Sequence, residues 1–197
     1  MLAIYRPYVL HTAITFEYDV PTSEFTRRWK PPCAPPYLVA EQAGELLGYA
    51  YAAPFHVRAA ISGPQRAPST SARISEGNGL APALRGLGTG AGAQNVLNCN
   101  ACIALPQAED ATLTQASVRF HQRMGYTLVG QFHQVGYKFD RWYHMVWMEK
   151  ALGAHTVPPA PFLPFPQIAE QVPALLASVT TRPFPGGAGA GAEASWR

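Results

Sequence analysis

The sequence predicts an α+β domain over residues 1–153 and a disordered tail over 154–197. Helical periodicity marks two segments, at 2–12 and 113–124, and several other segments alternate or are continuously apolar, as strands are. Residues 59–93 consist mostly of Ala, Gly, Pro, Ser and Arg and contain no aromatic side chain. Because this composition offers few core residues, we expect an irregular stretch at about 60–93.

The helices are bounded by recognisable residues. Residues 2–12 place their apolar side chains on one face. In the second helix, at 113–124, Thr114 is a candidate N-cap and Gly125 is positioned to close the helix. A shorter helix is expected from Ser23, and the prolines that follow it would end it.

The strand-like segments are short and bounded by turn residues. The first two surround a turn at 42–44 and predict a hairpin. The expected strands cover residues 37–41, 45–53, 95–105, 126–131 and 143–149.

Composition and charge argue against several classes of protein. The net charge of +3, without runs of like charge, argues against a nucleic-acid partner. No apolar segment approaches the ~18 residues of a membrane helix, and we detect no signal peptide, so we expect no membrane association. Three cysteines, an odd number, favour a reducing compartment, and we expect a cytoplasmic protein.

Two of the cysteines, Cys99 and Cys102, form a C-x-x-C, which is compatible with half a zinc site or a redox pair. Residues three apart on a strand point to opposite faces, and the chain has no second C-x-x-C. We therefore interpret them as strand thiols and expect no metal.

The tail is rich in proline and contains GGAGAGA, a composition that does not build a core. Its segments PPAP (158–161) and PFLP (161–164) fit the P-x-x-P pattern that SH3-type grooves bind. A binding module with a Pro-rich tail is therefore an alternative function, although a disordered tail is the simpler interpretation.

Four segments together resemble a known family: IYRPYVLHTAITFEYDVP (4–21), PYLVAEQAGELLGYAYAAPFHVRAA (36–60), AQNVLNCNACIALPQAEDATLTQASVRFHQRMGYTLVGQFHQVGYKF (93–139) and RWYHMVWMEK (141–150). They resemble the GNAT N-acetyltransferases, and most closely the phosphinothricin-acetyltransferase branch, whose members acetylate the amine of glutamate-like amino acids. The resemblance implies a GNAT-like mixed sheet flanked by helices. The family's first strand is lacking, because the chain starts at the first helix.

Acyl transfer to an amine requires that a base or a water relay removes a proton from the amine. The resemblance implies that His121 is the catalytic histidine of the branch, and an imidazole pKa near ~6.5 suits proton transfer. The branch also carries a glutamate in a W-T/S-x-E motif, soon after the segment that matches HVRAA. Here the chain reads ISGPQR, and the next acid is Glu76.

The resemblance further implies acetyl-CoA as co-substrate, held by a Q/R-x-x-G-x-G/A loop that opens a helix. EGNGLA (76–81) lies at the family spacing and makes Gly77, Gly79 and Ala81 the cofactor-binding candidates. RGLGTG (85–90) spells the motif but leaves no room for a helix before the next strand. Glycines and a proline follow EGNGLA, and they disfavour a helix there as well.

The candidates for substrate contact are Phe16, Tyr51, Arg58, Trp142 and Tyr143. Arg58 is suited to pairing with a substrate carboxylate, whereas the aromatic residues are more often part of a core. The resemblance implies a small-molecule amine as substrate, and a homodimer would be typical of the family.

The stretch at 60–93 has the composition that GC-rich DNA gives in a wrong reading frame. Reading the codons of Ile61 to Arg73 from the third base allows Q-W-T-x-E-S-T-V-Y-V-S-P, which restores the W-T-x-E motif. The alternative hypothesis is therefore a catalytically impaired family member, or a mistranslated gene model, that lacks its base and its coenzyme loop.

Overall fold

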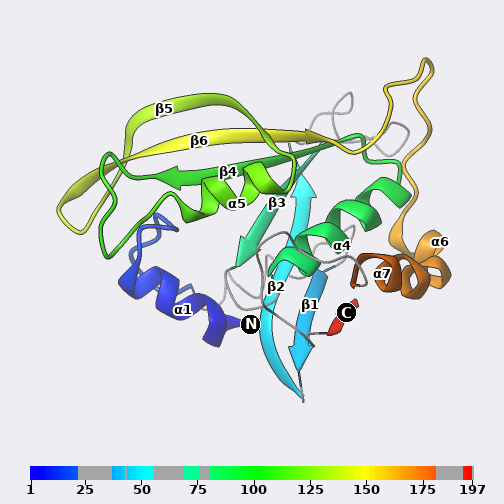
Figure 1. The fold of residues 1–197 in the computed structure, drawn as a ribbon, viewed down its shortest axis with the longest axis horizontal. Helices are drawn as coiled ribbons and strands as arrows, with labels where there is room; N and C mark the ends of the chain where they lie inside the picture. Colours follow the sequence, from blue (N-terminus) through cyan, green and yellow to red (C-terminus); the bar gives the residue numbers. More distant parts are fainter. Residues whose placement is uncertain (22–36, 43, 56–68, 76–79, 181–192, 197) are drawn as a thin grey trace. The chain divides into compact units, whose positions relative to one another are not determined.

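The computed structural model describes residues 1–21, 37–42, 44–55, 69–75, 80–180 and 193–196. The chain forms two compact units, whose elements are labelled in Figure 1. The first unit comprises Met1–Pro32 and Ala101–Lys150, and the second comprises Cys33–Asn100 and Ala151–Arg197. Strand β4 (Asn98–Leu105) contributes residues to both units. None of the described helices has the length and apolar character that a membrane crossing requires.

The first unit pairs β5 (Thr127–Lys138) with β6 (Arg141–Ala151) in antiparallel fashion, and β6 lies next to β4 in the sheet. Its helices are α1 (Leu2–His11) and α5 (Ala116–Arg123), which confirms both predicted helices. The left-handed Gly125, with φ +85°, follows α5 as predicted. The N-cap is Gln115 rather than Thr114, whose hydroxyl instead accepts a hydrogen bond from the amide of Ala116.

Both late strands are longer than the sequence predicts. The register of β5 against β6 shifts between Phe132 and Gly136, where Gln134 takes a φ of +52°. This irregularity interrupts the apolar–polar alternation from which a strand is recognised, so the prediction ended β5 too early.

The second unit has the strand order β7-β1-β2-β3-β4. Its other strands are β1 (Tyr37–Gln42), β2 (Glu45–Pro54), β3 (Ser69–Ser75) and β7 (Glu193–Trp196). Neighbours are antiparallel except β3 and β4, which run parallel and are connected through α4 (Leu80–Ala93). The predicted β1–β2 hairpin is confirmed, with Gly44 at φ +82° in its turn, and Figure 1 shows α4 beside these strands.

The prediction of an irregular stretch at 60–93 is wrong for Ser69–Ser75, which forms β3, and for Leu80–Ala93, which forms α4. Residues 60–68 and 76–79 lie outside the described residues, as does the helix expected from Ser23. The helix prediction failed because it counted only the propensity cost of glycine. Packing outweighs that cost, since α4 lies against β1, β2 and α7 (Val172–Thr180).

Gly86 shows why glycine is favourable within α4. A Cβ atom at this position would lie 2.7 Å from Cδ2 of Leu38 in β1 and 3.1 Å from Cδ2 of Leu176 in α7. Both leucines are buried, so a side chain at 86 would require the leucine side chains or the elements that carry them to shift within a packed core. The small residues of α4 therefore allow a close approach of helix, strand and second helix.

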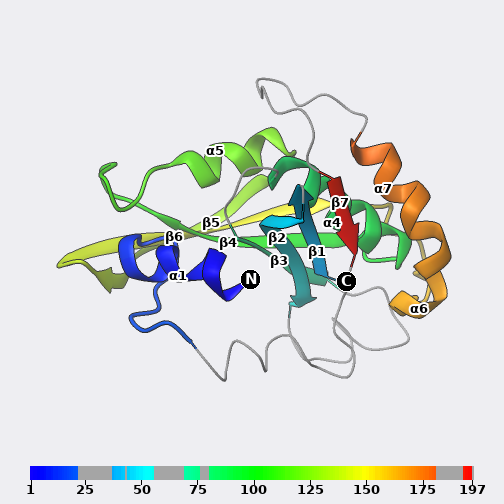
Figure 2. The ribbon, with the colours of Figure 1, turned by 90° about the horizontal axis from the view of Figure 1, so that it is seen from below.

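The expected disordered tail differs from the structure over residues 165–180, whereas residues 181–192 and 197 lie outside the described residues. Residues 165–180 form α6 (Phe165–Ile168), a 3-10 turn η1 (Ala169–Gln171) and α7, and Figure 2 shows α6 and α7 in orange to brown. Ile168, Val172 and Leu176 are buried, and their spacing of four gives one apolar helical face. The four-residue spacing of these apolar side chains was missed because the tail as a whole is so rich in proline.

Upstream of α6, the tail is hydrogen-bonded to the connection between α4 and β4. The Gln94 side-chain Nε2 donates to the carbonyl oxygen of Leu163, whose backbone amide donates to the carbonyl oxygen of Gln94. The side-chain Nδ2 of Asn95 donates to the carbonyl oxygen of Pro161. The P-x-x-P segments thus contact the chain itself. The proposed domain boundary at 153 stays a prediction.

Candidate active site

His121 lies in the last turn of α5 and is only 4% exposed. Its Nδ1 is 2.8 Å from the carbonyl oxygen of Ser117, one turn earlier. Because a carbonyl oxygen can only accept, Nδ1 carries the proton and the lone pair of the neutral ring lies on Nε2. The rings of Phe120 and Tyr126 meet the imidazole edge-on, with centroids at 5.5 and 5.2 Å. These contacts hold both the tautomer and the orientation of the ring.

Burial lowers the pKa of His121, because removal from water disfavours the charged imidazolium, and the hydrogen bond to Ser117 opposes this effect more weakly. At neutral pH the imidazole is therefore uncharged. An uncharged imidazole with its lone pair on Nε2 is able to accept a proton, as a general base must.

Two of the predicted substrate residues, Phe16 and Tyr143, lie together in the first unit. Their ring centroids are 6.4 Å apart. The Phe16 ring also covers Gly136 of β5, where a Cβ atom would lie only 2.5 Å from Cζ of the phenylalanine. Gly136 pairs directly with Tyr143 of β6, so Phe16 is seated on this pair. The rings pack on a small core of Ala13, Ala104 and Leu113.

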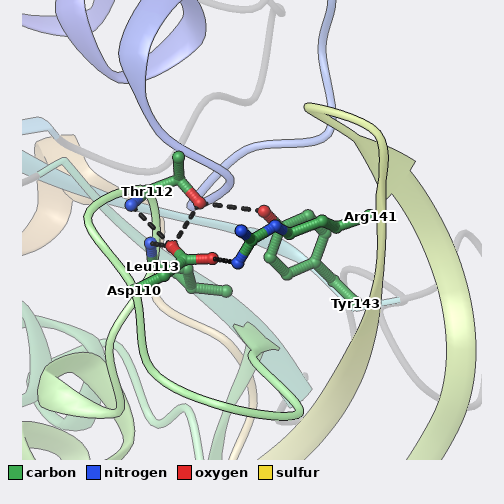
Figure 3. A network of polar contacts seen from close by, with 5 residues as sticks. All are labelled: Asp110, Thr112, Leu113, Arg141 and Tyr143. Carbon is green, nitrogen blue, oxygen red and sulfur yellow. Dashed lines mark hydrogen bonds and ion pairs between the residues drawn. The ribbon is translucent and has the colours of Figure 1, made fainter.

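The hydroxyl of Tyr143 belongs to a polar network, which is drawn in Figure 3. Asp110 Oδ1 accepts hydrogen bonds from the amides of Thr112, at 2.6 Å, and Leu113, at 3.0 Å. The Thr112 hydroxyl donates to the same oxygen at 2.6 Å, so the Tyr143 hydroxyl must donate to Thr112 Oγ1, at 2.8 Å. Arg141 pairs with Asp110 Oδ2 at 2.5 Å.

These contacts lower the pKa of Asp110, and the hydrogen bond from the Thr112 hydroxyl contributes most. The network joins the loop before α5 to β6, and Tyr143 is only 2% exposed. Its ring lies next to that of Phe16, and its hydroxyl is hydrogen-bonded within the protein. Sequence reasoning missed Asp110, although Asp-x-Thr before a helix is a recognisable Asx-turn pattern.

The structure describes two of the other three substrate candidates, Trp142 and Tyr51. Trp142 is exposed on the opposite side of β6 from its neighbour Tyr143, and its ring centroid is 5.1 Å from that of Tyr137. Tyr51 is half-buried in β2 of the second unit. Arg58 lies outside the described residues.

The predicted coenzyme-binding segment EGNGLA (76–81) leads into α4, a helix of 14 residues that begins at Leu80. Ala81 lies in the first turn, whose N–H groups have no intrahelical partner, while Gly77 and Gly79 lie outside the described residues. RGLGTG lies inside α4, where its N–H groups bond along the helix. RGLGTG is therefore excluded as a phosphate-binding loop, and EGNGLA stays the predicted one.

Cys99 is buried and Cys102 is exposed, so the two thiols lie on opposite faces of β4 as predicted. In the part of the chain that the structure describes, no three His, Cys, Asp or Glu side chains are grouped to hold a metal ion.

Comparison with known proteins identifies relatives of this fold. The acetyltransferase (GNAT) domain matches residues 91–147. A phosphinothricin N-acetyltransferase of Streptomyces coelicolor is 30% identical over 156 residues, which cover 76% of this chain and 87% of the relative. One from Alcaligenes faecalis is 32% identical over 165 residues, covering 77% of this chain and 76% of the relative.

A solved structure is also similar. The GNAT superfamily phosphinothricin acetyltransferase from Sinorhizobium meliloti, in complex with AcCoA, has a TM-score of 0.66 and 26% identity, covering 81% of this chain and 85% of the other. Fold and relatives define an acetyltransferase. The chain belongs to the GNAT acetyltransferase family, as its resemblance predicted, and its relatives include phosphinothricin N-acetyltransferases.

Proposed function

We propose that this acetyltransferase transfers the acetyl group of acetyl-CoA to the amine of a small amino acid or an amino-acid mimic of the phosphinothricin type. Two lines support the proposal: the names of the relatives described above, and the complex of the Sinorhizobium enzyme with AcCoA. The observation in this chain that carries it is His121, a buried imidazole whose lowered pKa leaves it uncharged at neutral pH.

His121 has the chemistry that the acceptor amine requires. A protonated amine has no lone pair, so it becomes a nucleophile only after it loses a proton. Nε2 accepts that proton, directly or through one water, while Nδ1 stays bonded to Ser117. The low polarity around the ring favours release of the proton after the transfer, since burial disfavours the imidazolium.

Acetyl-CoA, when bound, supplies the acetyl group as a thioester and leaves as the thiol. The N–H groups of Leu80 and Ala81 at the start of α4, together with the loop residues Gly77 and Gly79, would hold its pyrophosphate. The helix macrodipole adds partial positive charge at the same end.

The amine substrate would rest against Phe16, which Tyr143 and Gly136 hold from below. Arg58 is the candidate partner for a substrate carboxylate, since a guanidinium binds a carboxylate with two parallel hydrogen bonds. Tyr51 and Trp142 remain candidates for further contacts.

A catalytically impaired family member is the second candidate, because no glutamate follows HVRAA before Glu76. The two candidates differ in turnover. The purified full-length chain would be incubated with acetyl-CoA and a panel of amino acids that includes glutamate and phosphinothricin, and the N-acetyl product would be measured by mass spectrometry. Product formation supports the proposed function, and its absence with every amine supports the impaired enzyme.

The role of His121 is tested by His121→Gln. Loss of a general base typically lowers kcat by about 10²–10⁴-fold. His133→Gln is the matched control, because His133 is an exposed histidine on β5. A kcat that falls equally in both variants, or in neither, would remove His121 from the mechanism.

A further inference from the structure

Lys138, near the end of β5, is a buried cation that the acetyl-transfer chemistry does not use. It is 3% exposed, and its ammonium donates to three carbonyl oxygens, those of Val9 at 2.7 Å, Thr12 at 2.8 Å and Thr15 at 3.0 Å. An ammonium has three N–H donors, so all of them are used. Burying a charge is costly unless it is fully hydrogen-bonded, and this geometry meets that condition.

The three acceptors belong to one segment of chain, from the end of α1 to the bend that follows it. α1 ends at His11, and its C-cap Thr12 is extended rather than a left-handed glycine, so carbonyls of the last turn need other donors. Three carbonyl dipoles that converge on one point repel each other unless a cation lies among them. Lys138 is that cation, and it also complements the negative end of the helix macrodipole.

The segment that Lys138 holds carries Phe16. Gly136 and Lys138 are two residues apart on β5 and are both buried, so they share one face of the strand. The Phe16 ring lies over Gly136 while the ammonium of Lys138 binds the backbone of Thr15, the preceding residue. The two β5 residues thus hold the ring and the backbone of the same short segment.

A third contact strengthens this attachment, since the Tyr18 hydroxyl donates to the carbonyl of Tyr137 at 2.5 Å. From the opposite side, the amide of Ala13 donates to the carbonyl of Thr112, which belongs to the network below Tyr143. Among these contacts, only those of the Lys138 ammonium involve a full charge. Burial lowers the pKa of Lys138, and the nearby carboxylate of Glu17 opposes this shift.

We propose that Lys138 is a positioning residue for the amine substrate: its ammonium gathers the carbonyls of Val9, Thr12 and Thr15 and thereby sets the place of Phe16. This inference rests on the proposed function. Lys138 acts through the segment at 12–16 and contacts neither the amine nor acetyl-CoA, so its loss should affect amine recognition and spare coenzyme binding.

The test uses Lys138→Met, which keeps the length of the side chain and removes the charge. We expect the amine KM to rise tenfold or more, while the Kd of acetyl-CoA, measured by calorimetry, stays within twofold. Lys150→Met is the matched control, because Lys150 donates to one helix-terminal carbonyl, that of Met124, at 2.7 Å. It should leave the amine KM within twofold.

A double-mutant cycle with Phe16→Ala tests whether Lys138 acts through Phe16. If it does, adding Lys138→Met to Phe16→Ala changes the amine KM less than twofold, because the positioned ring is already gone. Independent additive effects would overturn the inference, and so would an equal rise of the amine KM and the acetyl-CoA Kd.

Hydrogen exchange separates this inference from the proposed function. Amides at 13–17 should exchange at least tenfold faster in Lys138→Met and unchanged in Lys150→Met, whether or not the chain transfers acetyl groups. Unchanged exchange in Lys138→Met would refute the positioning role, whereas absence of turnover by the wild type refutes the proposed function. If Lys138→Met does not fold, Lys138→Arg serves in its place, because it keeps the charge but cannot centre one nitrogen among three carbonyls.

Discussion

Gly86→Ala is the substitution that most sharply tests the packing of α4. Glycine within a helix normally costs about 0.5–1 kcal/mol relative to alanine, so propensity alone predicts that alanine stabilises the protein. The structure predicts the opposite, since the new Cβ would lie 2.7 Å from Cδ2 of Leu38 and 3.1 Å from Cδ2 of Leu176.

The magnitude follows from two opposing terms. Overpacking of a well-packed core costs about 1–3 kcal/mol, and the propensity gain offsets at most about 1 kcal/mol of it. Leu38 is fully buried, so any shift of its side chain has to be accommodated within a packed core. We therefore expect Gly86→Ala to lower the free energy of unfolding by up to about 2 kcal/mol, or Tm by up to about 8 °C for a chain of this size.

The assay is urea unfolding followed by tryptophan fluorescence and circular dichroism, with Gly88→Ala as matched control. A Cβ at Gly88 would meet only Cδ2 of Leu152, at 3.6 Å, which is ordinary contact. Gly88→Ala should therefore gain about 0.5–1 kcal/mol from propensity. If Gly86→Ala is as stable as Gly88→Ala, the close packing of α4 against β1 and α7 is refuted.

Four further predictions concern the first unit and the coenzyme. Gly136→Ala should displace Phe16, lower stability by about 1–3 kcal/mol and raise the amine KM, as unfolding and kinetic assays would show. Because burial lowers the pKa of His121, the unfolded chain binds its proton first, so stability should fall below about pH 6.5 more steeply in the wild type than in His121→Gln; parallel unfolding curves would contradict this. The lowered pKa of Asp110 contributes stability above its unfolded pKa that is lost as pH falls through the folded value, and Asp110→Asn should flatten the curve there. Acetyl-CoA at 100 times its Kd should stabilise the chain by about 2.7 kcal/mol, and the absence of any thermal shift would speak against the coenzyme site.

Elements whose own residues carry a clear periodicity and recognisable turn residues could be predicted from the sequence. α1, α5 and the β1–β2 hairpin carry clear periodicity and turn residues, and all were expected. α4 could not be predicted, because the reason for its glycines lies in Leu38 and Leu176, which are distant in sequence. Single-segment propensity cannot register a contact of this kind.

The candidate site likewise contains features that could be predicted from the sequence and features that could not. His121 was predicted from resemblance, but its tautomer and its lowered pKa depend on Ser117 and on aromatic neighbours that only the fold brings together. Lys138 lies in a segment whose alternation is broken, and its three acceptors are more than 120 residues away in the chain. A buried lysine of this kind has no sequence signature.

The central claim is that this chain transfers an acetyl group to an amino-acid amine. The most direct measurement is to incubate the purified full-length protein with acetyl-CoA labelled with ¹³C in the acetyl group and with phosphinothricin, and to analyse the product by mass spectrometry. The account predicts labelled N-acetyl product that accumulates with time and is strongly reduced in His121→Gln. Labelled product that never exceeds the enzyme-free control, with phosphinothricin and with every small amino acid, would contradict it.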